Sequence, residues 1–375
     1  MMLAGVRVVE IGQALAAPFA AEILADLGAD VIKVEKPDGG DDARHWGAAI
    51  WGDDAPMFHQ MNRNKRAICV DIKNADERER LIALIGSADV FLHNLRPGAA
   101  EASGLGAAAL RARFPRLIYG DLGAFGHRGP LSDRPGYELL LQAFGGLMSI
   151  TGEPGREGVR CGPSLNDLGT GIWAAIGILA ALIRRGRTGE GCLIEASLFE
   201  TALCWGSIHA ASYLASGEAP RAEGASHPSL TPYGAFETAD GRLIIGAGND
   251  RLFAKLAHAL GHPEWAEDAR FRDNRARVAN RAALTALING RLTQDSKAAW
   301  VERLEAVGVP CAPIQSIPEA LSHAQTAALG IIQRPDDGSP VRMIGMPLSF
   351  DGERPAVRLP APSLDRRDGS RSWQF

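Results

Sequence analysis

The amino-acid sequence predicts an α/β protein whose large domain is a doubly wound parallel sheet, accompanied by a smaller α+β domain. Three observations support this fold class. Short apolar runs alternate with helical patterns through the first part of the chain, which is typical of a parallel sheet. The chain has 375 residues, more than one hydrophobic core usually accommodates. The pattern of apolar residues also changes from residue 233 onward.

Strands of the large domain are expected where β-branched and apolar residues cluster. These clusters are Val6–Ile11, Val31–Val34, Ala67–Ile72, Val90–Leu95 and Leu117–Gly120. After the first cluster, Pro18 opens a helical pattern that stops at Gly28, because proline is tolerated in a first turn and glycine favours a helix end. A second helix is expected from Ala75 to Ile85.

The middle of the chain predicts a central helix from Gly169 to Arg185, with small residues at many positions. Small residues allow close helix packing, so we expect this helix to contact several neighbours. Its apolar part, Ile172–Ile183, is too short to span a bilayer. A strand at Leu193–Ala196 and a long helix reaching Ser216 follow.

The second domain is predicted after a polar linker at Ser216–His227. Tyr233–Gly248 has the pattern of a β-hairpin, with Asp240-Gly241 as its turn. Helices are expected near 250–261, 280–293 and 297–307. The residues after 320 are rich in proline and short apolar runs, so they must pack on another part of the protein.

Composition excludes several classes of partner. The net charge is -4, and 46% of the residues are hydrophobic, which indicates a folded protein without a general attraction to nucleic acid or membranes. The five cysteines show no metal-binding spacing, so we expect reduced thiols and no metal site. The N-terminus lacks the apolar run of a signal peptide, and a cytoplasmic location is expected.

The turn after the first strand does not have a nucleotide-binding motif. It reads Gly12-Gln13-Ala14-Leu15-Ala16-Ala17-Pro18, which differs from the glycine pattern of dinucleotide-binding proteins. A dehydrogenase is therefore disfavoured. Basic residues nevertheless occur near the predicted strand ends, where such sheets bind ligands. They are Lys33, Lys36, the segment Arg63-Asn64-Lys65-Arg66 and the segment His93-Asn94-Leu95-Arg96.

Two interpretations of these basic residues remain open. They could form a solvated charged rim, or they could bind a polyanionic ligand such as a nucleotide diphosphate. Asp167 also has two interpretations, because it lies at the start of the central helix. It could cap the helix, or it could be a nucleophilic carboxylate that a low pKa keeps ionised. Spacing does not decide between these alternatives.

Several long segments resemble the class III CoA-transferases, the family that includes formyl-CoA transferase, carnitine CoA-transferase and α-methylacyl-CoA racemase. The resemblance covers most of residues 1–350 and lies in VRVVEIGQALAAPFAAEILADLGADVIKVEKPDGGD, NRNKR, DVFLHNLRPG, RPGYELLLQAFGGLMSITG, NDLGTGIWAAIGILAALIRRGRTGEG and EASLFE. It implies a large domain from residues 1–200 and 325–375, a small domain at 225–320, and an interlocked homodimer.

The resemblance also implies a reaction at Asp167. The carboxylate would attack an acyl-CoA, and an aspartyl-CoA thioester would follow through a mixed anhydride. CoA is then a substrate rather than a permanently bound cofactor, and a carboxylic acid is the second substrate. The family's CoA contacts correspond to Gln13, Leu15, Ala16, Lys36, Val70, Ile72, Asn94, Leu95 and Tyr137. We add Arg96 as a second candidate, beside Lys36, for binding the CoA phosphates.

The family's mobile substrate loop corresponds to Gly224-Ala225-Ser226-His227. This segment contains less glycine than in formyl-CoA transferase, which disfavours formate and oxalate and favours short dicarboxylates such as succinate or glutarate. His227 could contact a distal carboxylate or could be structural. Two positions depart from relatives: Ala102 replaces a basic residue, and the C-terminal tail lacks a Gly-Glu-His-Thr segment.

Two alternative functions compete with CoA transfer. A racemase needs an acid/base pair at the substrate α-carbon, and the racemases use a histidine in a Gly-His-Asp segment. This chain has Gly136-Tyr137-Glu138 instead, and an ordinary tyrosine is a poor base at neutral pH. A non-catalytic acyl-CoA-binding protein would need the basic strand ends but no nucleophile.

Overall fold

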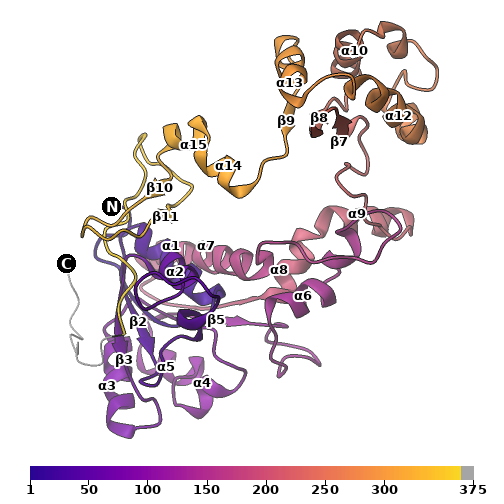
Figure 1. Ribbon diagram of the computed structural model, residues 1–375. Coiled ribbons are helices and arrows are strands. Elements are labelled where there is room, and N and C mark those ends of the chain that lie inside the picture. The colour runs from indigo at the N-terminus through magenta and orange to yellow at the C-terminus, as the bar shows by residue number, and fades with distance from the viewer. Residues whose placement is uncertain (365–375) are drawn as a thin grey trace. The chain divides into compact units, whose positions relative to one another are not determined.

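The computed structural model describes residues 1–364, and the chain divides into two compact units (Figure 1). Unit 1 comprises Met1–Met148, Arg160–Pro220 and the described residues from Ala324 onward. Unit 2 comprises Ser149–Val159 and Arg221–His323. Most of the tail that departs from the family pattern, residues 365–375, lies outside the described residues.

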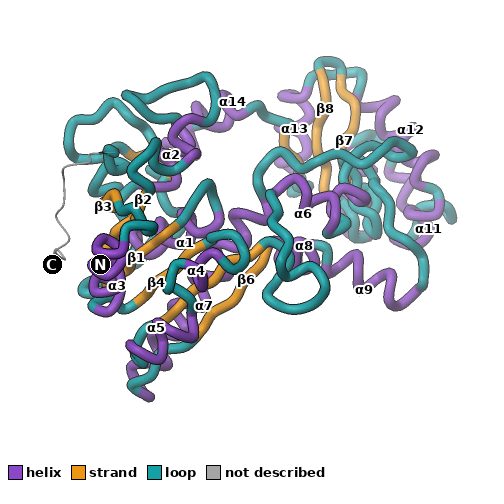
Figure 2. Tube along the Cα trace, turned by 90° about the horizontal axis from the view of Figure 1, so that it is seen from below, coloured by secondary structure: helices purple, strands orange, loops and turns teal. Residues whose placement is uncertain are grey.

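Unit 1 contains a six-stranded parallel sheet, visible in Figure 2 as a row of neighbouring strands. Its strand order is β3-β2-β1-β4-β5-β6. The strands are β1 (Arg7–Ile11), β2 (Asp30–Glu35), β3 (Lys65–Cys69), β4 (Val90–His93), β5 (Ile118–Gly123) and β6 (Leu193–Ser197). The order changes direction between β1 and β4, so the ligand-binding edge of such a sheet lies at the carboxyl ends of these two strands. The predicted α/β class is confirmed.

Helices cover both faces of this sheet. The helices of unit 1 are α1 (Ala16–Asp26), α2 (Pro56–Asn62), α3 (Ala75–Gly86), α4 (Ala99–Ala102), α5 (Ala107–Arg113), α6 (Glu138–Phe144), α7 (Leu165–Thr188), α8 (Leu198–Trp205), α9 (Ser207–Ser216) and α15 (Ala324–Leu329), with short 3-10 helices at Asp42–His45 (η1) and Leu147–Ile150 (η2). Helices α1 and α7 share one hydrophobic core with the sheet. Helices α3 and α5 share a second core on the opposite face, as a doubly wound sheet requires.

Helix α7 is longer than the sequence pattern predicted. It has 24 residues, and by length and composition alone it could cross a bilayer. Ala174 and Ile178 are fully buried against the sheet and α1. It is therefore a core helix of a soluble protein. The helix expected to reach Ser216 is interrupted at Gly206, which ends α8 and precedes α9.

Unit 2 is built on a three-stranded antiparallel sheet of order β7-β8-β9. Its elements are β7 (Tyr233–Thr238), β8 (Gly241–Gly246), α10 (Asp250–Ala259), η3 (Pro263–Ala266), α11 (Asn274–Ala279), α12 (Arg281–Leu292), α13 (Lys297–Ala306), β9 (Cys311–Pro313) and α14 (Ile317–Ser322). The predicted hairpin is present, with Gly241 at a positive φ of 136° in its turn. Helix α11 and strand β9 are too short for apolar periodicity to reveal.

The C-terminal part of the chain returns to the start of unit 1. It contributes a small hairpin of β10 (Ile332–Gln333) and β11 (Met343–Ile344). Asn64 Oδ1 accepts hydrogen bonds from the backbone N–H groups of Arg358 and Leu359, at 2.7 and 2.9 Å. Arg44 donates to the carbonyl oxygen of Pro362 at 3.0 Å. Buried polar groups near the N-terminus are thus satisfied by residues near the C-terminus.

Candidate active site

Asp167 lies in the first turn of α7, on the side of the helix that faces α1. Gly171, one turn later on the same side, makes this approach possible. A Cβ atom at Gly171 would lie 2.9 Å from the carbonyl oxygen of Ala16 and 3.2 Å from the amide nitrogen of Ala20. The small residue at this position therefore allows the α7 turn that carries Asp167 to lie against the N-terminal turn of α1.

A different carboxylate caps helix α7. Glu138, the first residue of α6, accepts hydrogen bonds from the backbone N–H groups of Asn166 and Asp167, each at 3.0 Å. Gln142 donates to the other oxygen of Glu138 at 2.6 Å, and Ser164 at the N-cap position forms no side-chain cap. The interpretation of Asp167 as the capping residue is therefore wrong, because Glu138 already occupies the free N–H groups.

The electrostatic surroundings of Asp167 also differ from the prediction. Burial, reinforced by the carboxylate of Glu138, raises the pKa of Asp167 to about 7. We predicted a low pKa from the helix N-terminus, and this was wrong because Glu138 takes those N–H groups and adds a second negative charge. Among the described residues, no basic side chain forms an ion pair with Asp167. A partly desolvated carboxylate of this kind is about half ionised at neutral pH.

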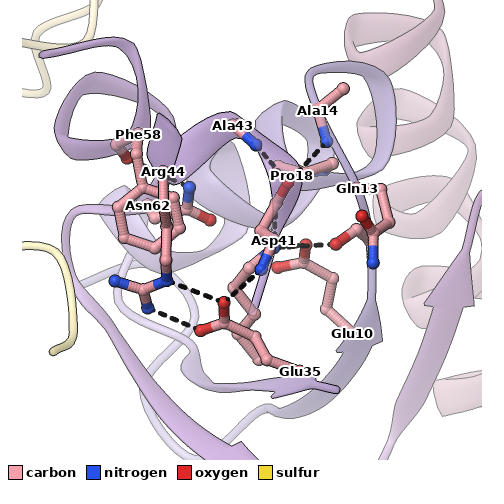
Figure 3. A network of polar contacts seen from close by, with 12 residues as sticks. Glu10, Gln13, Ala14, Pro18, Glu35, Asp41, Ala43, Arg44, Phe58 and Asn62 are labelled. Atoms are coloured by element: carbon pink, nitrogen blue, oxygen red, sulfur yellow. Dashed lines mark hydrogen bonds and ion pairs between the residues drawn. The ribbon is translucent and has the colours of Figure 1, made fainter. Parts of the chain in front are cut away.

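The loop between β1 and α1 is fixed by side chains from the segments that follow β4 and β2. Asn94 accepts from the backbone N–H of Gln13 at 2.9 Å and donates to its carbonyl oxygen at 2.8 Å. Asp41 accepts from the N–H of Ala14 at 3.0 Å (Figure 3). Ala14 has a φ of 62°, which is unfavourable for a residue with a Cβ atom. Leu15 and Ala16, buried at the start of α1, complete the loop.

Several basic residues at the strand ends are buried and paired. Lys33 is fully buried and contacts Glu10 at 3.1 Å, Asp41 at 2.9 Å and the carbonyl oxygen of Gly12 at 2.8 Å. Lys65 contacts Glu10 at 2.8 Å. Both interpretations offered for these two lysines, a solvated rim and a phosphate-binding group, are therefore wrong.

Three further basic positions near the strand ends are also paired or carry no charge. Arg63 pairs with Asp26 and Glu22 in the interior, and Arg66 pairs with Asp30. His93 is buried against the hydroxyl of Tyr119, and burial lowers its pKa to about 4. A neutral histidine cannot balance a phosphate charge. The paired residues belong to the framework of the sheet.

Two of the predicted phosphate-binding residues are accessible. Lys36 forms an ion pair with Asp42 at 2.6 Å, and about half of its side chain is exposed. This neighbouring carboxylate raises the pKa of Lys36, so the side chain is charged at neutral pH. Arg96 is exposed after β4. Both follow strands that flank β1, so their positions are compatible with one ligand at the carboxyl edge.

Three of the predicted CoA contacts belong to one core. Val70 is buried, and Ile72 and Leu95 are partly buried against the same cluster. Tyr137 lies at the N-cap position of α6 and is 64% exposed. It immediately precedes Glu138, so it lies next to the residue that caps α7.

The predicted substrate loop belongs to unit 2. The Gly224 N–H donates to the carbonyl oxygen of Gly152 at 2.9 Å, and Ser226 bridges to Gly234; Ala225 lies between them. The ring of His227 stacks on Tyr233 with ring centroids 5.4 Å apart. Its Nδ1 accepts from the N–H of Ser229 at 3.1 Å, so one ring nitrogen already has a local partner.

Two residues of this arrangement were missed in the sequence. Glu138 follows Tyr137 directly, but its role as a cap depends on contacts with residues 28 and 29 positions further along the chain. Asp41 follows Gly39-Gly40 after β2, and a carboxylate after a strand and two glycines was the available signal. Its partner, the Ala14 N–H, becomes apparent only from the order of the strands.

Comparison with known proteins identifies the family. Residues 3–368 match the CoA-transferase family III. The chain is 38% identical over 330 residues to the succinyl-CoA:glutarate CoA-transferase of Mus musculus, covering 88% of this chain and 76% of that protein. It is 36% identical over 373 residues to the acetyl-CoA:oxalate CoA-transferase of Acetobacter aceti, covering 99% and 95%.

A solved structure is similar over the same extent. The crystal structure of a CAIB/BAIF family protein from Brucella suis has a TM-score of 0.86 and 40% sequence identity, and the match covers 97% of this chain and 96% of that one. The fold, the site and these similarities define a CoA-transferase. The chain belongs to the CoA-transferase family III, whose members use CoA thioesters as substrates.

Proposed function

We propose that this CoA-transferase moves CoA from an acyl-CoA to a free carboxylic acid through a thioester on Asp167. The observation that carries the proposal is the position of Asp167, which is partly buried in the first turn of α7 beside the carboxylate of Glu138. Burial, reinforced by that carboxylate, raises the pKa of Asp167 to about 7. A carboxylate that burial has partly desolvated is a better nucleophile than one in water. Perturbed carboxylates of this type concentrate at catalytic sites.

The proposed reaction has four steps. A carboxylate oxygen of Asp167 attacks the thioester carbonyl, the carbon–sulfur bond breaks, and CoA thiolate leaves a mixed anhydride. The thiolate attacks the aspartyl carbonyl, which releases the donor acid and forms aspartyl-CoA. The acceptor carboxylate attacks this thioester and expels the thiolate again. The thiolate then attacks the acceptor carbonyl, forming the new acyl-CoA and regenerating the Asp167 carboxylate.

The first turn of α1 supports this mechanism. Each step passes through an oxyanion, which N–H donors stabilise. Leu15 at the N-cap position of α1 makes no side-chain cap, so the first N–H groups of the helix are available to a ligand. The close approach at Gly171 brings the turn of Asp167 against this helix end.

Mass spectrometry of the intact protein tests the mechanism. After mixing with succinyl-CoA, we expect a mass increase equal to CoA minus one water, located on the peptide that contains Asp167. Asp167→Asn should form no adduct. Asp53→Asn, an exposed aspartate of the same unit, is the matched control and should react as the unaltered chain does. An adduct that persists in Asp167→Asn would refute the proposal.

The proposed acid is a short dicarboxylate such as succinate or glutarate. The name of the mouse relative supports this class, and the segment Gly224–His227 resembles the loop of dicarboxylate transferases. A panel of CoA donors crossed with acids, followed by chromatography of the thioesters, tests it. Oxalate belongs in the panel because the Acetobacter aceti relative is named for it. Faster transfer to oxalate or formate than to both succinate and glutarate would overturn the assignment.

We propose that CoA binds at the carboxyl ends of β1, β2 and β4. Gln13, Lys36 and Asn94 follow these three strands, and the exposed Lys36 and Arg96 supply positive charge. Removing each charge, in Lys36→Ala and Arg96→Ala, should raise the KM for acyl-CoA severalfold and leave that for the acid unchanged. A KM for acyl-CoA that equals that of the unaltered chain in both variants would exclude this binding mode.

We also propose that two copies of the chain form a homodimer, interlocked as the family resemblance implies. Helix α9 has no buried residue, and an isolated helix of this length is marginally stable in water. Large apolar side chains are exposed on α7, α8 and α9: Ile172, Trp173, Ile176, Leu203, Trp205, Ile208 and Leu214. A second copy would cover them. Sedimentation equilibrium should give twice the chain mass, and an active monomer would contradict the proposal.

A cytoplasmic location is proposed for the same enzyme. The cysteines at positions 69, 161, 192, 204 and 311, all within the described residues, form no disulfide, which suits a reducing compartment. Cell fractionation with a tagged chain tests this location, and recovery in an oxidising compartment would contradict it.

A further inference from the structure

The loop between β1 and α1 is held in an unfavourable conformation by side chains that bond to its backbone. The positive φ of Ala14 costs about 1 kcal/mol in a residue with a Cβ atom. Such a conformation persists only where the surroundings determine it. Both backbone groups of Gln13 are bonded to the Asn94 amide, at 2.9 and 2.8 Å. The N–H of Ala14 is bonded to Asp41.

The side chains that hold this loop are themselves fixed. Asp41 is fully buried, and its own N–H donates to Glu35 at 2.8 Å. Arg44 donates two hydrogen bonds to the same carboxylate of Glu35, at 2.7 and 2.9 Å. Its guanidinium carbon lies 3.8 Å from the centroid of the Phe58 ring. Figure 3 shows this chain of contacts from Phe58 to Ala14.

The loop is also held on its other side. Lys33 contacts Asp41 and donates to the carbonyl oxygen of Gly12, just before Gln13. Lys65 donates to the carbonyl oxygen of Pro18, just after the loop, at 2.7 Å. Burial alone would raise the pKa of Asp41, but the ammonium group of Lys33 and two backbone N–H groups outweigh it and lower the pKa. Asp41 is therefore charged at neutral pH and keeps Lys33 in place.

We infer that Asn94 and Asp41 are positioning residues of the transferase, which fix the Gln13–Ala14 backbone in the shape that accepts the CoA thioester. The inference rests on the proposed function and assigns Asn94 a different role from the one implied by resemblance. The oxygen and one N–H of its side-chain amide are engaged with Gln13. We therefore assign its contribution to CoA binding to the position of the loop rather than to a direct contact with CoA.

Asn94→Asp is the sharpest test, because it changes the chemistry of one atom while preserving shape. One carboxylate oxygen can still accept from the Gln13 N–H, but the other faces the Gln13 carbonyl oxygen and repels it. We expect the loop to lose its conformation while the sheet remains intact. Asp38→Asn, an exposed aspartate between β2 and Asp41, is the matched control. Asn94→Ala, which removes both hydrogen bonds without adding charge, is the second variant.

Amide hydrogen exchange gives a readout that is independent of catalysis. In the peptide covering residues 12–19, we expect exchange about tenfold faster in Asn94→Asp and Asn94→Ala. The peptide covering α3 should be unchanged in both variants, which excludes global destabilisation. The dissociation constant for free CoA, measured by calorimetry, should rise about tenfold. The KM for acyl-CoA should rise similarly, with kcat changed less than threefold.

The outcomes separate this inference from the proposed function. Faster exchange in residues 12–19 together with weaker CoA binding supports the inference. Unchanged exchange in that peptide in both variants overturns it, and so does faster exchange with unaltered CoA affinity. An unaltered chain that binds CoA but forms no aspartyl adduct refutes the proposed mechanism while leaving the positioning role of Asn94 measurable by exchange and calorimetry.

Discussion

Two carboxylates in unit 1, the buried Glu10 and the partly buried Asp167, have opposite surroundings. Glu10, at the centre of the sheet, lies between the ammonium groups of Lys33 and Lys65, at 3.1 and 2.8 Å. Asp167, at the start of α7, has the carboxylate of Glu138 as its charged neighbour. Burial alone would raise the pKa of Glu10, but the two lysines outweigh it and lower the pKa. The pKa of Asp167 rises instead, to about 7.

This difference shows how to distinguish structural from reactive carboxylates. A buried charge with matched counterions is satisfied, and it contributes to a fixed framework. A partly buried carboxylate that faces another carboxylate is held in an unfavourable state that a reaction can relieve. The four substitutions that follow test this contrast, starting with the largest expected effect.

Asp167→Asn should abolish transfer and stabilise the protein. We expect kcat to fall at least about 1000-fold, because the nucleophile is lost. The raised pKa means that the folded state binds the Asp167 proton more tightly than the unfolded state does, so stability falls as pH rises from about 4 to 7. Asparagine removes this cost, and the free energy of unfolding at pH 8 should rise by about 1–3 kcal/mol, allowing for partial exposure.

Urea unfolding at pH 4 and pH 8 measures this effect. The gain in stability should be present at pH 8 and small at pH 4, where Asp167 is protonated in the folded state and close to its ordinary pKa in the unfolded chain. A loss of stability at pH 8 would mean that the Asp167 carboxylate has a counterion, and the contrast with Glu10 would fail.

Lys33→Met should destabilise the protein without any change in the chemistry of Asp167. It leaves Glu10 and Asp41 without a shared counterion in the interior, which costs about 3–5 kcal/mol. Lys36→Met is the matched control, because Lys36 pairs with Asp42 at the surface, where a pair contributes about 0–1 kcal/mol. Denaturant unfolding of both variants gives the difference. Equal effects would show that the Glu10–Lys33 pair is no more important than a surface pair.

Gly171→Ala should disturb the region of Asp167 through packing. The added Cβ atom would meet backbone atoms of Ala16 and Ala20 in α1, which cannot move as a side chain can, and we expect a loss of about 1–3 kcal/mol. Gly186→Ala, near the other end of α7, meets no atom within 4 Å. It should stabilise the chain by about 0.5–1 kcal/mol. Thermal unfolding of the two variants should therefore shift in opposite directions, and shifts of the same sign would contradict the close approach at Gly171.

Glu138→Gln should shift the pH dependence of adduct formation. The amide oxygen can still accept from the α7 backbone, but the negative charge beside Asp167 is gone. The pKa of Asp167 should fall by about one unit and stay above its ordinary value, because burial remains. Single-turnover adduct formation, which needs the ionised carboxylate, should reach half its maximum near pH 7 in the unaltered chain and near pH 6 in the variant. Coincident profiles would show that Glu138 does not influence Asp167.

The sequence predicted the strands and helices of the sheet better than the charge partners of single residues. Strand and helix positions follow from apolar runs, which are local. Lys33 looked like a residue at a charged strand end, and only the register shows that it pairs with Glu10 on the neighbouring strand. Helix α1 begins at Ala16 rather than Pro18, because proline is tolerated anywhere in the first turn. Charge partners depend on strand order and helix packing, which local patterns do not contain.

The return of the C-terminal residues to unit 1 has a consequence for biosynthesis. Asn64 leaves the ribosome 294 and 295 residues ahead of its two partners, Arg358 and Leu359. The chain between them includes all of unit 2. Unit 1 therefore cannot complete its hydrogen bonding until nearly all of the chain has been synthesised, whereas residues 221–323 emerge as a continuous stretch. Contacts this far apart in sequence form slowly. We therefore expect unit 2 to be largely folded before Asn64 forms its hydrogen bonds with Arg358 and Leu359.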